Sequence, residues 1–184
     1  MNFSVNRSLL CSLSLLFLLA GGMSVTAGSD NQTHVCDRVK PSQLLTQAIA
    51  ERMLGQSVRL TPDTNTMKGD VRQCMCAYFG VSKDKATGQD SVIYFSLEEK
   101  EKRPSPEEAR QVLVSTKEAN AHDTEVLDLG GIGDEAFLLG NDPNSHLIMA
   151  RKGGIIMRLQ VKKAVGTTSL EESKAFAAKV FKGL

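Results

Sequence analysis

The sequence has no tryptophan and few other aromatic residues, which limits the ligands that it can be expected to bind. Phe and Tyr together make up 5% of the 184 residues. Surfaces that bind sugars or bases usually offer aromatic rings on which the ligand stacks, so such surfaces are not expected. Charge of one sign is also lacking, because 22 basic residues are matched by 21 acidic ones. A nearly neutral chain has no electrostatic preference for nucleic acid or anionic membranes.

Motifs of the common enzyme classes are also missing. The sequence contains no Gly-x-Ser-x-Gly nucleophile elbow and no Cys-x-x-Cys pair. None of its histidines, His34, His122 and His146, is spaced to pair with a nucleophile. Asp134 and Glu135 are adjacent at the start of a predicted strand, so their carboxylates are expected to point to opposite faces. We therefore expect a non-catalytic protein without a cofactor.

Only one long hydrophobic run is present, and it lies at the N-terminus. Residues 9–20 are almost wholly apolar, follow the basic Arg7, and precede the small-residue exit Val25-Thr26-Ala27. This arrangement is typical of a secretory signal. The run is about 12 residues long, whereas a bilayer span needs roughly 20. The pattern predicts a signal peptide over residues 1–27, cleavage after Ala27, and a periplasmic or extracellular protein without a transmembrane span. Cys11 lies too early in the run to accept a lipid.

The remaining chain is long enough for a single domain. Removal of Arg7 with the signal leaves 21 basic and 21 acidic residues, so the exported chain is neutral. Residues 28–35 are mostly small and polar and read as a flexible leader. Residues 36–184 are predicted to form one domain with one hydrophobic core.

Hydrophobic periodicity and turn signals predict an α+β domain. A helix is expected over residues 41–54, a loop over 56–70, and a hairpin of strands over 71–81 and 91–97. Capping boxes at Ser105 with Glu108 and at Ser169 with Glu172 predict two further helices. Between those helices, strands are expected at 126–129, 136–139, 146–151 and 155–161. The predicted order is α-β-β-α-β-β-β-α, with 126–129 as a short strand or lead-in, and about three helices pack on an antiparallel sheet.

Three cysteines remain after signal removal, and they predict one disulfide with one spare thiol. Cys74 and Cys76 lie two residues apart on one strand and so face the same side, where either could meet Cys36. The alternative is a soft-metal site for copper or zinc, formed by His34, Cys36, Cys74 and Cys76, with Met53, Met67 and Met75 as further thioether ligands for copper.

The turn motif Gly131-Ile132-Gly133-Asp134-Glu135 is a further candidate site. It lacks the third glycine of a dinucleotide-binding fingerprint, and no Gly-Lys-Ser/Thr follows it. Gly131 and Gly133 are therefore expected to supply positive φ angles in a turn.

Several of these features together resemble a group of bacterial secreted proteins and lipoproteins of unknown function. The resemblance rests on Cys36 before a helix that ends in Leu54-Gly55, on Cys76-Ala77-Tyr78, and on the glycine turn followed by Ala136-Phe137. It implies a Cys36–Cys76 disulfide with Cys74 as the odd thiol, and it implies no activity. The sequence departs from the group in lacking a lipid-acceptor Cys and in having Cys74. A fold like the PsbP-like α+β sandwiches is expected by analogy.

Taken together, these features predict an exported binding or accessory domain of the cell envelope. Its partner is expected to be an unknown protein or small ligand. A soft-metal-binding protein is the first alternative, and an envelope hydrolase without assignable catalytic residues is the second.

Overall fold

The computed structural model describes residues 33–85, 87–102, 105–140 and 142–184. The predicted signal peptide (residues 1–27) and most of the predicted leader lie outside the described residues. At the end of the leader the prediction of flexibility is wrong. Val35 begins a helix and is fully buried, because its side chain joins the main hydrophobic core.

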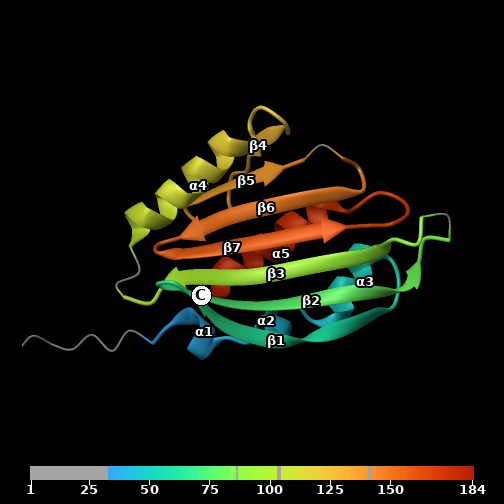
Figure 1. Cartoon of the computed structure of the whole chain (residues 1–184), viewed down its shortest axis with the longest axis horizontal. Coiled ribbons are helices and arrows are strands. Elements are labelled where there is room, and N and C mark those ends of the chain that lie inside the picture. Colours follow the sequence, from blue (N-terminus) through green and yellow to red (C-terminus); the bar gives the residue numbers. More distant parts are fainter. Residues whose placement is uncertain (1–32, 86, 103–104, 141) are drawn as a thin grey trace, which may run out of the picture. The chain divides into compact units, whose positions relative to one another are not determined.

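Strands dominate the described part of the chain and form a seven-stranded sheet in which every neighbouring pair is antiparallel. The order across the sheet is β1-β2-β3-β7-β6-β5-β4, as Figure 1 shows. The bounds are β1 Val58–Lys68, β2 Val71–Lys83, β3 Asp90–Lys100, β4 Val126–Asp128, β5 Glu135–Leu139, β6 Ser145–Lys152 and β7 Ile155–Lys162.

Five helices accompany this sheet within the described residues. They are α1 Val35–Arg38, α2 Pro41–Leu44, α3 Gln47–Leu54, α4 Pro106–Asn120 and α5 Leu170–Gly183. The side chains of Ser105 and Ser169 accept hydrogen bonds from the third residue of α4 and α5, as the capping boxes predict. The fold is thus α+β, as predicted, but its helices and strands are more numerous than expected.

Two segments differ from the sequence-based expectation. The predicted loop 56–70 is wrong, because it contains β1, whose polar, threonine-rich sequence does not show the usual apolar alternation. β1 is an edge strand, exposed along most of its length, and the register shifts between Thr61 and Thr64 around Pro62. Proline is tolerated at such an irregular edge. The predicted helix 41–54 is interrupted, since Leu45 leaves the helical conformation and fills the core.

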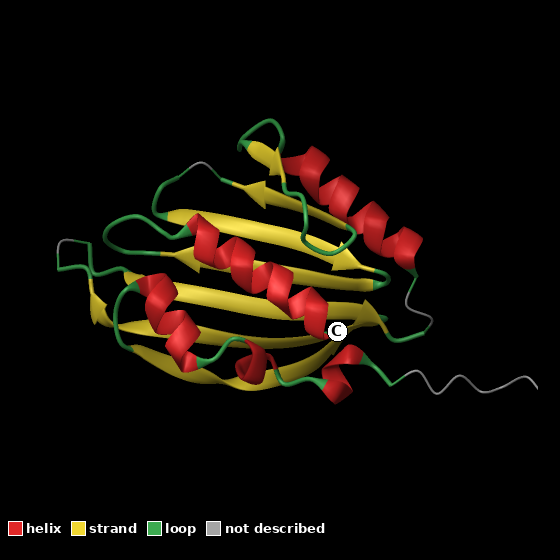
Figure 2. Ribbon diagram, turned by 180° about the vertical axis from the view of Figure 1, so that it is seen from behind, coloured by secondary structure: helices red, strands yellow, loops and turns green. Residues whose placement is uncertain are grey.

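The helices lie on both faces of the sheet but cover it unequally. α1, α2, α3 and α5 cover one face (Figure 2), and their side chains join the larger of two hydrophobic clusters. α4 packs on the opposite face through Ala109 and Leu113, against Phe137 of β5, Met149 of β6 and Ile156 of β7. The second face is therefore covered mainly over β5 and β6.

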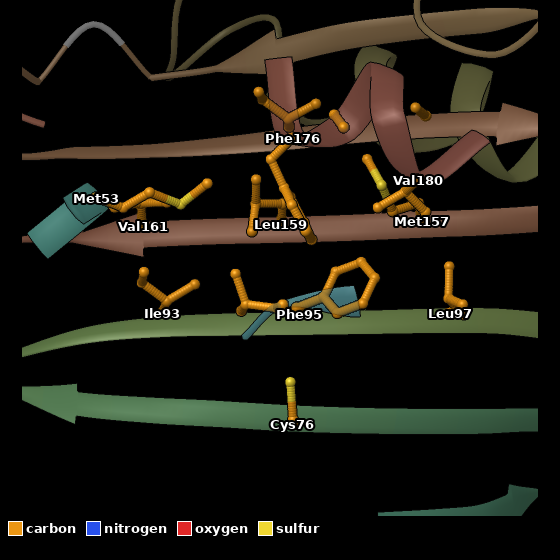
Figure 3. Packing of buried hydrophobic residues seen from close by; sticks show 14 of the residues in the cluster. Met53, Cys76, Ile93, Phe95, Leu97, Met157, Leu159, Val161, Phe176 and Val180 are labelled. Atoms are coloured by element: carbon orange, nitrogen blue, oxygen red, sulfur yellow. The ribbon is translucent and has the colours of Figure 1, made fainter. Parts of the chain in front are cut away.

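The main core lies between α5 and the central strands, as Figure 3 shows. Phe95 of β3 meets Phe176 of α5 edge to face, with ring centroids 5.1 Å apart. Such aromatic pairs add to the stability that their buried area provides. None of the described helices is long and apolar enough to cross a membrane.

Candidate binding face

One face of β1, β2 and β3, and of β7 beyond Ile156, has no covering layer among the described residues (Figure 1). Residues paired across an antiparallel sheet have their side chains on the same face, so the strand registers define this surface. We call it the open face. It comprises Arg59, Thr61, Thr64, Thr66 and Lys68 of β1, Gln73, Met75, Ala77 and Phe79 of β2, Val92, Tyr94, Ser96 and Glu98 of β3, and Arg158, Gln160 and Lys162 of β7.

The middle of the open face is apolar. Met75, Ala77 and Phe79 of β2 lie beside Val92 and Tyr94 of β3. The rings of Phe79 and Tyr94 meet edge to face, with centroids 6.0 Å apart. Tyr94 at the centre of this surface remains 37% exposed, whereas Ala77 and Val92 are buried and Met75 and Phe79 are half-buried. We call these five residues the apolar strip.

A pocket of about 230 Å³ lies where α4 approaches the open face. Its apolar lining comes from Val71 of β2, Ala109 and Val112 of α4, and Ile156 of β7. Glu98 and Arg158 of the open face also line the pocket, so the pocket and the open face form one continuous surface. A pocket of this size fits an apolar side chain, which would be desolvated there.

The charges of the open face are unequal. Glu98 pairs with Arg158 at 3.0 Å, whereas the exposed cations Arg59, Lys68 and Lys162 have no ion-pair partner among the described residues. The register places Arg59, Phe79, Val92 and Lys162 in one row across the sheet. The apolar strip is thus flanked by an unpaired cation on each side.

The cysteines do not pair as the resemblance implies. The disulfide joins Cys36 of α1 to Cys74 of β2, with Cα atoms 5.5 Å apart, so the Cys36–Cys76 pairing is wrong and Cys74 is the partner. Cys76 is the free thiol and is buried on the same side of the sheet as Phe95 (Figure 3). Burial raises the pKa of the Cys76 thiol to about 12. At neutral pH it is therefore a protonated, unreactive thiol.

The alternative soft-metal site is not assembled. Two of its thiolates are used by the disulfide, and His34 instead lies between carboxylates, with Nδ1 3.2 Å from Glu99 and Nε2 3.6 Å from Glu101. The buried Glu99 carboxylate also accepts a hydrogen bond from the backbone N–H of Val35. Within the described ranges, no group of three or more His, Cys, Asp or Glu side chains is arranged to hold a metal ion.

The glycine turn has a structural role. Gly131 and Gly133 have positive φ angles of 78° and 60°, as predicted. The Asp134 and Glu135 carboxylates do not diverge, contrary to expectation, because both bind the guanidinium of Arg151 at 3.1 and 3.0 Å. The hydrogen bond from Arg151 lowers the pKa of Glu135. This clamp fastens the turn to β6.

The three histidines lie at different places in the fold, with His34 before α1, His122 after α4 and His146 on β6. His146 is buried between two hydroxyl groups, with Nδ1 2.8 Å from Thr168 Oγ1 and Nε2 2.9 Å from Ser173 Oγ. Ser173 itself is fully buried on α5. His122 is exposed just beyond the end of α4.

A second hollow, of about 370 Å³, lies between α4 and the β4–β5 hairpin. Its charged groups are engaged with one another or with their neighbours. Lys117 binds Asp128 at 2.5 Å, and Glu135 binds Arg151. The hollow offers less free binding capacity than the open face.

Comparison with known protein families, curated proteins and solved structures finds no match to this chain.

The sequence reasoning missed the open face as a site. The alternation of residues 71–81 predicted a strand, but neither face of that strand was assigned a binding role. The signal was present in the apolar character of both faces of β2. An antiparallel strand that is apolar on both faces usually has both covered, and here the described chain covers only one.

Proposed function

We propose that this protein is an exported, non-catalytic binding domain of the cell envelope, and that the open face is its binding surface. The observation that supports the proposal is the apolar strip on a sheet face without a covering layer. Uncovered apolar surface of this kind is costly in water and marks interaction sites. A disulfide in the described domain accords with an oxidising, extracytoplasmic location.

The polar groups elsewhere support a binding role over catalysis. His146 is bonded to hydroxyl groups inside the fold, and the Asp134 and Glu135 carboxylates are occupied by Arg151. A general base needs access to a substrate proton, which a buried His146 does not have. The open face combines the exposed Tyr94 and the half-buried Met75 and Phe79 with unpaired charge at its edges, and protein interfaces likewise have an apolar centre and a polar rim.

Site-specific photo-crosslinking tests the proposal. A benzoylphenylalanine replaces Tyr94 on the apolar strip, or Val112 beside the pocket, in cells that export the chain. The matched control carries the same residue at Ala175, which is exposed on the opposite, helix-covered side. We expect adducts from positions 94 and 112 and none from 175. Equal adducts at all three positions, or none at 94, would overturn the proposal.

A further inference from the structure

The charge pattern around the apolar strip indicates the chemistry of its partner. We propose that the open face binds an acidic polypeptide segment whose apolar side chains lie on the strip and whose carboxylates meet Arg59, Lys68 and Lys162. This inference rests on the proposed binding role of the open face and specifies the occupant.

The charges on and beside the open face do not balance. Four anions there pair with three cations, because Asp70 and Glu108 share Lys100. Glu98 binds Arg158, Asp90 lies 3.7 Å from Lys83, and Lys100 binds Asp70 at 2.9 Å and Glu108 at 3.1 Å. With Arg59, Lys68 and Lys162, these groups amount to six cations and four anions, so this side has an excess of two positive charges in a domain whose overall charge is balanced. Complementary charge on a partner would select that partner and speed its association.

The rows of paired residues across the open face leave room for a chain segment between two cations. In one row Arg59 and Lys162 stand at either end, with Phe79 and Val92 between them. Because neighbouring strands are about 4.8 Å apart, these two cations are separated by roughly 14 Å of backbone. A chain segment laid along the strip fits between them, with its acidic side chains reaching outward on both sides.

At the far end of the strip, a cation lies close to the pocket beneath α4. Lys68 pairs with Val71, and Val71 lines the pocket beneath α4. The third unpaired cation is thus beside the site where an apolar side chain would be buried. An apolar anchor flanked by an acidic residue would satisfy both features at once.

A second copy of the chain is a poorer occupant. Packing two open faces together would bring six unpaired cations close, and like charges at an interface oppose association. Nucleic acid is also disfavoured, because single-stranded binding surfaces use several exposed rings. Tyr94 is the one aromatic ring among the exposed large hydrophobic residues of the described chain.

Binding of defined polymers tests the inference. The probe is a random copolymer of glutamate with tyrosine, and its counterpart is a copolymer of lysine with tyrosine. Binding to the purified, disulfide-bonded chain is followed by fluorescence anisotropy at two salt concentrations. We expect the glutamate copolymer to bind, more weakly at high salt, and the lysine copolymer not to bind.

Two charge-reversed triple variants locate the interaction. Arg59→Glu, Lys68→Glu and Lys162→Glu remove the unpaired cations of the open face. The control Arg52→Glu, Lys179→Glu and Lys182→Glu makes the same change in net charge at exposed positions of α3 and α5. We expect the first triple to weaken binding at least about tenfold and the control to change it less than about twofold. Circular dichroism verifies that both variants are folded.

Three results would overturn the inference. The first is a wild-type protein that does not bind the glutamate copolymer or binds the lysine copolymer equally. The second is an equal loss in both triples, which would indicate net charge alone. The third is tighter, face-dependent binding of heparin, oligothymidylate or vesicles of equal phosphatidylglycerol and phosphatidylcholine. In each case, adducts confined to positions 94 and 112 would still support the open face as a binding surface, so the two proposals fail separately.

Discussion

At the scale of single residues, Gly133 has a conformation and a setting that no other residue type can match. Its φ angle is 60°, and a Cβ atom there would collide with the carbonyl oxygen of Arg151. Arg151 is held in place because its guanidinium binds Asp134 and Glu135. A side chain at position 133 would therefore separate the turn from β6 and break the clamp.

We predict that Gly133→Ala lowers the free energy of unfolding far more than Gly131→Ala. Gly131 also has a positive φ angle, but an added Cβ would meet no atom within 4 Å. Gly131→Ala should therefore cost only the conformational strain, about 1–2 kcal/mol. Gly133→Ala should cost at least about 2 kcal/mol more because of the backbone clash. Urea denaturation measures both, and equal losses would mean that the turn does not contact β6 closely.

His146 is the residue whose protonation should affect stability near neutral pH. The Ser173 hydroxyl lies 3.0 Å from the Ser169 carbonyl oxygen, and the Thr168 hydroxyl lies 3.2 Å from the Pro143 carbonyl oxygen. A neutral imidazole donates from one ring nitrogen and accepts at the other, so one of these hydroxyls donates to the ring. Burial lowers the pKa of His146 from its ordinary 6.5. In the described part of the chain, His146 forms no ion pair with a carboxylate that would compensate a positive charge.

We predict that the protein loses stability as pH falls below about 6.5 and that His146→Gln reduces this loss. The unfolded chain takes up the histidine proton near pH 6.5, whereas folded His146 takes it up only at lower pH. Unfolded molecules therefore bind more protons in this window, and acid favours unfolding. Urea titrations at about pH 7 and about pH 5 measure the effect. An unchanged difference between these pH values in His146→Gln would contradict the prediction, and His122→Gln, at an exposed site, is the control.

At the scale of elements, α4 depends on its cap because it packs on the smaller of the two clusters. The Ser105 side chain accepts a hydrogen bond from the Glu108 N–H at 3.3 Å. We predict that Ser105→Ala lowers the free energy of unfolding by about 1 kcal/mol and speeds hydrogen exchange in α4 more than in α5. Ser115→Ala is the matched control, since that exposed hydroxyl bonds only within its own helix. Equal exchange rates in the two variants would show that the cap does not stabilise α4.

The elements also show how far the sequence predicts this fold. The hairpin of β2 and β3 and both capped helices were predictable, because local alternation and capping residues define them. β1 was not, since an exposed edge strand buries too little side-chain area to need apolar alternation. The break at Leu45 escaped prediction for a related reason. The hydrophobic periodicity of residues 41–54 continues through Leu45, so the sequence shows no end of the helix there. The packing of Leu45 in the core overrides its local helix propensity.

The candidate site was less predictable than the fold. The alternation of side chains along a strand predicted that Cys74 and Cys76 lie on the same face, and it left both as possible disulfide partners of Cys36. The choice depends on where α1 lies along β2, and a short helix carries no signal for that position. The location of the open face depends on which face of the sheet α4 covers. The sequence around Ser105 indicates where α4 begins, but it does not indicate which face the helix covers.

At the scale of the whole molecule, the two faces of the sheet are treated differently. Four helices cover one face of the sheet, and the disulfide joins α1 to β2 on that side. The core on that face is therefore covered by the chain itself. The other face carries α4 at one end and the apolar strip beside it. Under the proposed function, this division would let the open face bind and release a partner without disturbing the main core.

The disulfide contributes to the stability of the whole domain by restricting the unfolded chain. It closes a segment with a sequence separation of 38 residues, and a loop of that size is worth about 3–4 kcal/mol. We predict that the double variant Cys36→Ser with Cys74→Ser loses about this much free energy of unfolding.

Cys76→Ser should retain the disulfide between Cys36 and Cys74. Alkylation of this variant without reductant should then add no mass to Cys36 or Cys74, as intact mass spectrometry can show. Because Cys76 is buried beside Phe95, its serine variant tests packing alone. If Cys76→Ser instead lost the crosslink, the Cys36–Cys76 pairing would be the native one, and the position of α1 on β2 would have to shift along the strand.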